Sequence, residues 1–410
     1  MHFRIIVAAT MNRIFILALS IVLVAIAPVA AEESKSEDFN SFVASLWPEA
    51  EARGVSRATF DAAFKGVMPD PQVIAASRRQ PEYNQPVGAY IASFASDRRA
   101  VAGKARRARF DATLAAVEQK FGVDRLLLLA IWGIESDYGT EPKGSDVVRS
   151  LATLAHARYR DPFFRNELVA ALVILQQGHV ARDRMLGSWA GAMGQPQFIP
   201  SSFLRYAVDF SGDGRADIWT NVPDVLASIA HYFRENGWIA GLPWGFEVAI
   251  PSGFDYRRSR APFAAWAALG MKRTDGGELP QVGEAILLFP SGYKGPAFLV
   301  TRNFEAIKRY NNSDAYALAA ATLADRMRGG GVIRGRWPDD DRPLSREERA
   351  ELERALAALG YKVNDFQGQI DFDLRDNVRE IQAGAGLVPD GNPNAEVLAI
   401  VRARLANGRR

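Results

Sequence analysis

The carboxylic acid of Glu135 is the side chain in this sequence that is best suited to proton transfer. On a helical period it shares a face with Leu128, Ile131 and Trp132. A carboxylate among apolar side chains is poorly solvated, so we expect the pKa of Glu135 to be raised and the group to hold its proton near neutrality. Such an acid can protonate the oxygen of a leaving group. The alternative is an acid that points into water, as most helical glutamates do.

A second group of polar side chains occurs in residues 187–203, a stretch dense in glycine and other small residues. Glycine lets a backbone approach a ligand or another segment closely. Ser188 and Gln197 could donate hydrogen bonds to a sugar or to its acetamido group. The alternative is a loop that packs tightly between helices.

Oxygen-bearing side chains recur at every second position from Asp209 to Asp217, with Gly214 at the sharp turn. This spacing is typical of the first half of a calcium-binding loop. Thr220 stands where a bidentate glutamate would close such a loop, and Asp224 could close the ligand shell instead. The alternative is a turn rich in aspartate that binds no metal.

These groups must be held by helices, which the sequence predicts for most of its length. The helix that carries Glu135 should begin at Asp124, a good N-cap, and end through Gly139 and Pro142. A long helix is expected over residues 104–121. Further helices are expected over residues 146–156, 167–179, 224–238, 303–311 and 314–327. Short apolar runs bounded by proline and glycine predict a small antiparallel sheet, inserted at about residues 244–300, with strands at 246–250, 285–289 and 297–300.

The end of the sequence predicts a separate small unit. A glycine-rich start and an aspartate run mark residues 329–341 as a linker. Residues 342–410 then predict three helices, the first from Ser345, the second near 373–382 and the last after Gly391.

Composition narrows the class of protein. The net charge of +3 and the pI of about 9.0 suit an acidic surface such as a cell-wall polymer, but they are too weak to indicate nucleic acid. The sequence has no cysteine, and its four histidines are not at metal-ligand spacing. Residues 1–31 are typical of a cleavable secretory signal, with Arg13 before an apolar core at 14–27. We therefore expect a periplasmic protein without a stable membrane anchor.

Several of these motifs occur together in one known family. The sequence resembles the lytic murein transglycosylase B family, bacterial enzymes that cleave the glycan strands of peptidoglycan. The resemblance covers roughly residues 38–328 and rests on the motifs at 133–139, 187–202, 209–214 and 302–311. Residues 342–406 resemble a three-helix peptidoglycan-binding domain, although Ile381 replaces its usual aromatic residue.

The resemblance implies a fold and a set of roles. It implies a mostly helical α+β protein, with a lysozyme-like catalytic domain at 32–328 that contains an EF-hand-like loop at 209–224. Glu135 matches the catalytic acid/base of the family. Residues that match its substrate-contacting positions are Ser188, Gln197, Tyr310, Tyr316 and, less closely, Tyr90. Residues that match its calcium ligands are Asp209, Ser211, Asp213, Asp224 and the backbone carbonyl of Arg215.

A glycosidase that uses one acid needs a nucleophile from the substrate. Asp137 is the nearest acid to Glu135, but two positions along a helix turn it to another face. We therefore expect a transglycosylase that closes a 1,6-anhydro ring on N-acetylmuramic acid, with no cofactor and with any calcium in a structural role. The alternatives are a hydrolytic muramidase on the same fold and a non-catalytic peptidoglycan-binding scaffold. The expected partner is the glycan strand. We also expect a monomer, with cell-wall synthesis complexes as further partners.

Overall fold

Helix α8 (Arg125–Ser136), which carries Glu135, lies within the largest hydrophobic core of the computed structural model. The structure describes residues 38–77, 85–141, 144–364 and 366–408. As predicted, Asp124 caps α8, its carboxylate accepting a 2.7 Å hydrogen bond from the backbone N–H of Leu126. The helix ends before the expected glycine, because Asp137 and Tyr138 already have left-handed φ angles of 48° and 61°.

Tyr138 shows why this helix end needs glycines. Its ring lies against Gly133 of α8 and Gly103 of α6 (Asp97–Arg109), and its hydroxyl donates to the backbone carbonyl of Arg99. A Cβ atom would lie 2.6 Å from the ring at Gly133 and 2.5 Å from the hydroxyl at Gly103. The two glycines therefore let Tyr138 pack between α6 and α8, which fixes the turn that follows Glu135.

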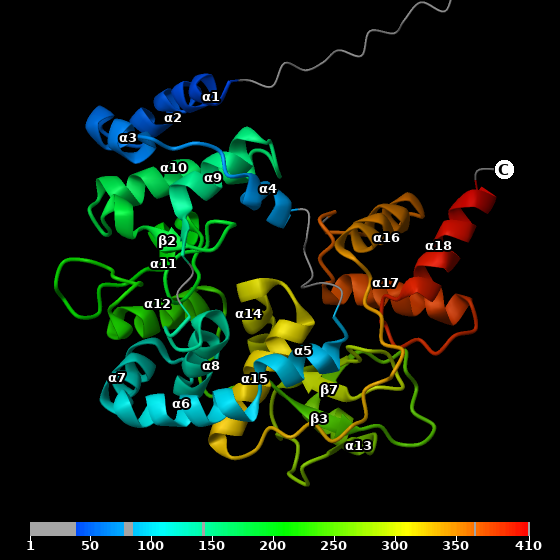
Figure 1. Ribbon diagram of the computed structural model, residues 1–410. Coiled ribbons are helices and arrows are strands. Elements are labelled where there is room, and N and C mark those ends of the chain that lie inside the picture. The colour runs from blue at the N-terminus through cyan, green and yellow to red at the C-terminus, as the bar shows by residue number, and fades with distance from the viewer. Residues whose placement is uncertain (1–37, 78–84, 142–143, 365, 409–410) are drawn as a thin grey trace, which may run out of the picture. The chain divides into compact units, whose positions relative to one another are not determined.

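The helices around α8 form the first layer of the fold (Figure 1). They are α5 (Val87–Phe94), α6, α7 (Asp111–Phe121), α12 (Val222–Glu235), α14 (Arg302–Asn311) and α15 (Asp314–Arg328). The single long helix predicted over 104–121 is wrong, because the chain breaks at Phe110 between α6 and α7. Phe110 turns its ring onto the edge of Trp132, with 5.8 Å between the ring centroids. A tertiary contact thus overrides the local helical pattern.

A second helical core stands beside the first. It is built from α1 (Phe39–Ser45), α2 (Trp47–Ala52), α3 (Arg57–Phe64), α4 (Pro71–Ser77), α9 (Val147–His156), α10 (Phe163–Gln176) and α11 (Pro200–Tyr206). A two-stranded sheet pairs β1 (Ser145–Asp146) with β2 (Leu186–Gly187), next to a short 3-10 turn at Arg182–Arg184.

The predicted inserted sheet is present and antiparallel. Its strand order is β4-β6-β7-β3-β5. The strands are β3 (Gly245–Ala249), β4 (Arg260–Pro262), β5 (Lys272–Arg273), β6 (Glu284–Leu288) and β7 (Ala297–Val300), with α13 (Phe263–Ala268) between β4 and β5. The mostly helical α+β class is therefore confirmed.

The segment predicted as a linker is tied to the rest of the chain. Glu247 of β3 accepts hydrogen bonds from the backbone N–H groups of Arg334 and Gly335. Asp341 accepts hydrogen bonds from the backbone of Val87 and from the hydroxyl of Ser291. Residues 334–341 therefore lie against the sheet and against α5.

The C-terminal residues form three helices around a core of their own, as predicted. They are α16 (Arg346–Ala358), α17 (Phe372–Gly384) and α18 (Ala395–Gly408). Ile381 is fully buried in that core. The secretory signal predicted at residues 1–31 lies outside the described residues. Within the described part of the chain, no helix is both long enough and apolar enough to cross a bilayer.

Candidate active site

The carboxylate of Glu135 meets a tyrosine from a distant part of the chain. Glu135 is partly exposed in the last turn of α8, and its Oε1 accepts a 2.6 Å hydrogen bond from the hydroxyl of Tyr316 in α15. Burial raises the pKa of the Tyr316 hydroxyl well above its usual range, and the negative charge of Glu135 raises it further. The hydroxyl therefore keeps its proton and remains a donor to Glu135. The expected raised pKa of Glu135 itself stays a prediction.

Tyr310 brings a second segment to the same place. Its ring is parallel to that of Tyr316, with 6.3 Å between centroids and 6° between planes. Its hydroxyl donates to the backbone carbonyl of Pro196 at 2.7 Å. Burial raises the pKa of Tyr310 well above its usual range, and the charge of Glu135 raises it further. The structure thus brings together Glu135, both predicted tyrosines and the segment that contains Gln197.

Ser188 and Gln197 are held by hydrogen bonds within their own loop. Gln197 has a left-handed φ of 54°, and its amide donates to the carbonyl of Gly194 at 2.7 Å. The Ser188 hydroxyl accepts a 3.1 Å hydrogen bond from the N–H of Ala192. Isolated bridges then link Gly187 to Met193 and Met193 to Phe198. These bonds give the loop one conformation beside Tyr310, and contact with substrate stays a prediction for both residues.

Tyr90 lies in α5, which packs against α15. Its ring is stacked on Phe94 with 4.4 Å between centroids, and it is buried. An ionised Tyr90 would also raise the pKa of Tyr316, which indicates that the two side chains are close. Tyr90 is therefore near Tyr316.

Sequence reasoning missed Gln195, which connects three parts of the site. Its Oε1 accepts a 2.7 Å hydrogen bond from the indole N–H of Trp132, and its Nε2 donates to the carbonyl of Trp219 at 2.7 Å. A Cβ atom on Gly139 would lie 2.5 Å from the same Oε1. Gln195 thus joins α8, the turn after Glu135 and the end of the 209–219 loop. Nothing in the sequence distinguishes it from Gln197, two residues later.

Tyr232 of α12 was also missed. Its ring lies 4.8 Å from that of Tyr310, and its hydroxyl donates to the carbonyl of Arg309 at 2.7 Å. It supports the ring of Tyr310. A tyrosine on an amphipathic helix carries no local signal of such a contact.

Asp137, the acid nearest to Glu135 in the sequence, is paired with two arginines. It is buried and its carboxylate is paired with Arg98 at 2.9 Å and Arg99 at 3.4 Å. Burial alone would raise the pKa of Asp137, but the hydrogen bond and charge of Arg98 and the charge of Arg99 outweigh it and lower the pKa. The carboxylate is therefore ionised and engaged, as the expectation of a single acid requires.

In the loop predicted to bind calcium, the carboxylates of Asp209 and Asp224 accept hydrogen bonds from the backbone of the loop. Asp209 accepts hydrogen bonds from the backbone N–H groups of residues 212–214. Asp224 accepts from those of Phe210, Ser211 and Asp217. In the described part of the chain, no group of three His, Asp or Glu side chains is placed to hold a metal ion. In this arrangement both carboxylates bind backbone N–H groups of the loop, and calcium binding by the loop stays a prediction.

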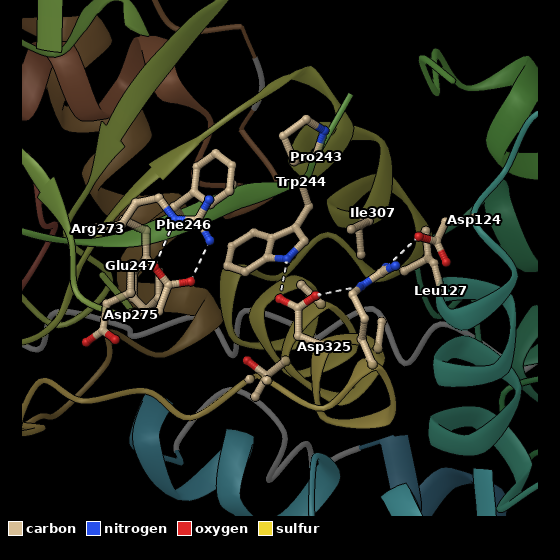
Figure 2. A pocket seen from close by; sticks show the side chains of 18 of the residues that line it. Asp124, Leu127, Pro243, Trp244, Phe246, Glu247, Arg273, Asp275, Ile307 and Asp325 are labelled. Atoms are coloured by element: carbon tan, nitrogen blue, oxygen red, sulfur yellow. Dashed lines mark hydrogen bonds and ion pairs between the residues drawn. The ribbon is translucent and has the colours of Figure 1, made fainter. Parts of the chain in front are cut away.

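A cavity lies at the other end of α8 (Figure 2). It measures about 680 Å³, and Asp124 and Leu127 line it beside Trp244 and Asp325. Trp244 donates to Asp325 at 2.9 Å, and Arg328 is paired with Asp124 at 2.5 Å. Because it does not include Glu135 and these charged groups are paired, this cavity is not the place of the acid–base chemistry.

Tyr316→Phe tests the contact with Glu135. Removing the hydroxyl takes away a hydrogen bond to a charged group, and we expect kcat to fall by roughly tenfold to a hundredfold. The hydroxyl favours the ionised carboxylate, so its loss should shift the basic limb of the pH–rate profile to higher pH. Peptidoglycan turnover measured across acidic, neutral and alkaline buffers checks both effects. An unchanged profile would mean that Tyr316 does not act on the acid.

Comparisons with known proteins identify the family of the chain. Residues 38–325 match the Transglycosylase SLT domain family, and residues 345–401 match a peptidoglycan binding domain. Membrane-bound lytic murein transglycosylase B of Escherichia coli is 34% identical over 215 residues, which are 51% of this chain and 58% of that protein. The match thus spans less than two thirds of that relative's length.

Two solved structures extend the comparison. SltB3 from Pseudomonas aeruginosa, solved with NAG-anhNAM-pentapeptide, is 46% identical with a TM-score of 0.80, over 89% of this chain and 100% of that one. Slt35 of Escherichia coli, solved with calcium, shares the fold at 24% identity and a TM-score of 0.60, over 72% of this chain and 94% of that one. Since the SLT match covers more than half of its residues, the chain belongs to the SLT transglycosylase family, lytic enzymes of peptidoglycan, and adds a C-terminal peptidoglycan-binding domain.

Proposed function

We propose that this chain cleaves the β-1,4 bond between N-acetylmuramic acid and N-acetylglucosamine and leaves 1,6-anhydromuramic ends. The observation that carries the proposal is the hydrogen bond from Tyr316 to Glu135. The neighbouring Asp137 forms ion pairs with Arg98 and Arg99 instead. One acid with a fixed donor suits a reaction in which the substrate supplies its own nucleophile. The anhydro sugar bound in the SltB3 complex supports the same product.

In the first step, Glu135 gives its proton to the oxygen that links the two sugars. The bond between that oxygen and C1 of the muramic residue breaks, and the acetamido group stabilises the positive charge at C1. Tyr316 then donates its hydrogen bond to the new carboxylate.

In the second step, the C6 hydroxyl of the same sugar attacks C1. Glu135 takes the proton of that hydroxyl, which closes the 1,6-anhydro ring and returns the acid to its starting state. Because both reacting atoms belong to one sugar, proximity replaces an activated water. No cofactor enters either step.

The remaining predicted residues complete this proposal. Ser188 and Gln197 contact the acetamido groups, and Tyr310, with Tyr90 near Tyr316, holds the sugar beside Glu135. The metal ligands Asp209, Ser211, Asp213, Arg215 and Asp224 stay a prediction, with any calcium structural. The recurrence of oxygen-bearing side chains from Asp209 to Asp217 is what supports that prediction.

We also propose how the chain is divided and where it works. The proposed parts are a signal at 1–31, a catalytic domain at 32–328, a connecting segment at 329–341 and a peptidoglycan-binding domain at 342–410. The matched ranges 38–325 and 345–401 support the two domains. Peptidoglycan belongs to the cell envelope, and with the signal removed the mature chain would work in the periplasm as a monomer. Complexes with cell-wall synthesis proteins are a further expectation.

Digestion of purified peptidoglycan followed by mass spectrometry tests the function. We expect fragments that end in 1,6-anhydromuramic acid, and none from the Glu135→Gln variant. Fragments with reducing ends, each one water heavier, would identify a hydrolytic muramidase instead. A wall suspension that stays turbid and releases no fragments would identify a binding scaffold.

A further inference from the structure

The turn between α14 and α15 connects the active-site tyrosines to the C-terminal domain. Asp314, the first residue of α15, follows Tyr310 by four residues and precedes Tyr316 by two. Its side chain is only 11% exposed. One oxygen is 2.8 Å from Nζ of Lys308, and the other accepts a 2.5 Å hydrogen bond from Nη2 of Arg375. The carboxylate thus lies between two cations, one of which comes from α17.

Arg375 is itself held firmly by the C-terminal domain. Its side chain is 4% exposed, and its Nη1 donates to the carbonyl of Gly391 at 3.1 Å. Lys308 binds the same domain through the carbonyl of Ile370. Burial alone would raise the pKa of Asp314, but the charges of Lys308 and Arg375 outweigh it and lower the pKa to about 2. The Asp314 carboxylate is therefore ionised at neutral pH and pairs with both cations.

The α14–α15 turn, which Arg375 binds through Asp314, also sets the position of Tyr316. Ser313 caps α15 by accepting a hydrogen bond from the backbone N–H of Tyr316 at 3.3 Å. Asn312 just before it has a left-handed φ of 44°, which surrounding contacts must maintain. A small rotation of this first helical turn would move the Tyr316 hydroxyl out of reach of Glu135, since catalytic contacts tolerate little displacement.

We propose that Arg375 of the C-terminal domain is a positioning residue for catalysis: by clamping Asp314 it holds the first turn of α15, and so the hydroxyl of Tyr316, against Glu135. The inference rests on the proposed role of Glu135. The C-terminal domain then supports the active site as well as binding the wall polymer. Its contact with α15 raises the rate of the chemical step and not merely the affinity for peptidoglycan.

The test is Arg375→Met in the full-length chain, which removes the charge and keeps most of the length of the side chain. We expect kcat on peptidoglycan to fall about tenfold, equivalent to roughly 1.4 kcal/mol, with KM changed less than about twofold. The basic limb of the pH profile should shift in the same direction as in Tyr316→Phe. Arg375→Lys keeps the charge and should recover part of the loss. If Arg375→Met unfolds below the assay temperature, kcat, KM and the pH profile of Arg375→Lys are used for the test instead.

Arg260→Gln is the matched control. Arg260 also crosses to α17, pairing with Asp373 and Asp376 at 3.3 and 3.5 Å, but it is 45% exposed and its ion pairs do not involve the α14–α15 turn. It should keep the parental kcat and pH profile. An equal loss of kcat in Arg260→Gln would show that general loosening of the domain contact is responsible, and would overturn the assignment to Arg375.

A double-mutant cycle separates action through Tyr316 from an independent effect. If Arg375 acts through Tyr316, the variant with both Arg375→Met and Tyr316→Phe should have the kcat of Tyr316→Phe alone. Losses that multiply, or a change confined to KM, would overturn the inference. Glu135→Gln measured in parallel keeps the two proposals apart. If it is inactive while Arg375→Met is normal, only the inference fails; if it is active, the proposed function fails.

Discussion

Glu135→Gln is expected to lower kcat on peptidoglycan by at least about three orders of magnitude, the scale lost when a general acid–base group is removed. The amide has nearly the same shape as the carboxylic acid, so the fold and the contact with Tyr316 should persist. It cannot give a proton to the glycosidic oxygen, and it cannot take one from the C6 hydroxyl. Both proposed steps therefore stop, while the polymer can still bind.

Turnover and binding must be measured separately for this variant. Release of soluble fragments reports kcat, and co-sedimentation with insoluble peptidoglycan reports binding, which we expect to be unchanged. Glu141→Gln is a suitable control, because Glu141 is an exposed acid just beyond the helix end. It should retain parental activity. Parental turnover by Glu135→Gln would mean that a different acid protonates the bond.

Asp224→Ala should have the largest effect on stability among the loop variants, lowering the free energy of unfolding by roughly 3–5 kcal/mol. Asp224 is 0% exposed, and its two oxygens accept hydrogen bonds of 2.9, 3.0 and 3.0 Å from three backbone N–H groups. Alanine has no side-chain oxygen, so these three backbone N–H groups would lose their hydrogen-bond acceptor. The damage should also reach the active site, because the end of this loop binds Gln195 through the carbonyls of Ile218 and Trp219.

Urea unfolding of Asp224→Ala with calcium or with a chelator distinguishes the two roles of this carboxylate. If it serves as a cap for backbone amides, the loss of stability should be the same in both conditions. Asp213→Ala is the control, since Asp213 is exposed and accepts a hydrogen bond from the N–H of Arg215. Asp213→Ala should lower the free energy of unfolding far less than Asp224→Ala does. A loss of stability seen only when calcium is present would show that Asp224 acts mainly as a calcium ligand.

Local patterns predicted those parts of the fold that local forces control. Asp124 caps α8 as expected, because a carboxylate next to free N–H groups needs no distant partner. The strands at 246–250, 285–289 and 297–300 were found within one residue, because proline and glycine bound each apolar run. The break at Phe110 was not predicted, since it depends on the position of Trp132 in the folded chain.

The sequence by itself indicated the family, because its motifs depend on residue types at short spacing, and through that resemblance it predicted Glu135 as the acid. It also identified Tyr310 and Tyr316 through their resemblance to family positions. Only the tertiary structure showed which groups lie against Glu135 and against the turn that carries Tyr316. Tyr316 reaches Glu135 across 181 positions of the chain, and Arg375 reaches Asp314 across 61. Contacts at such separations follow from how whole helices pack, and no local pattern records that packing.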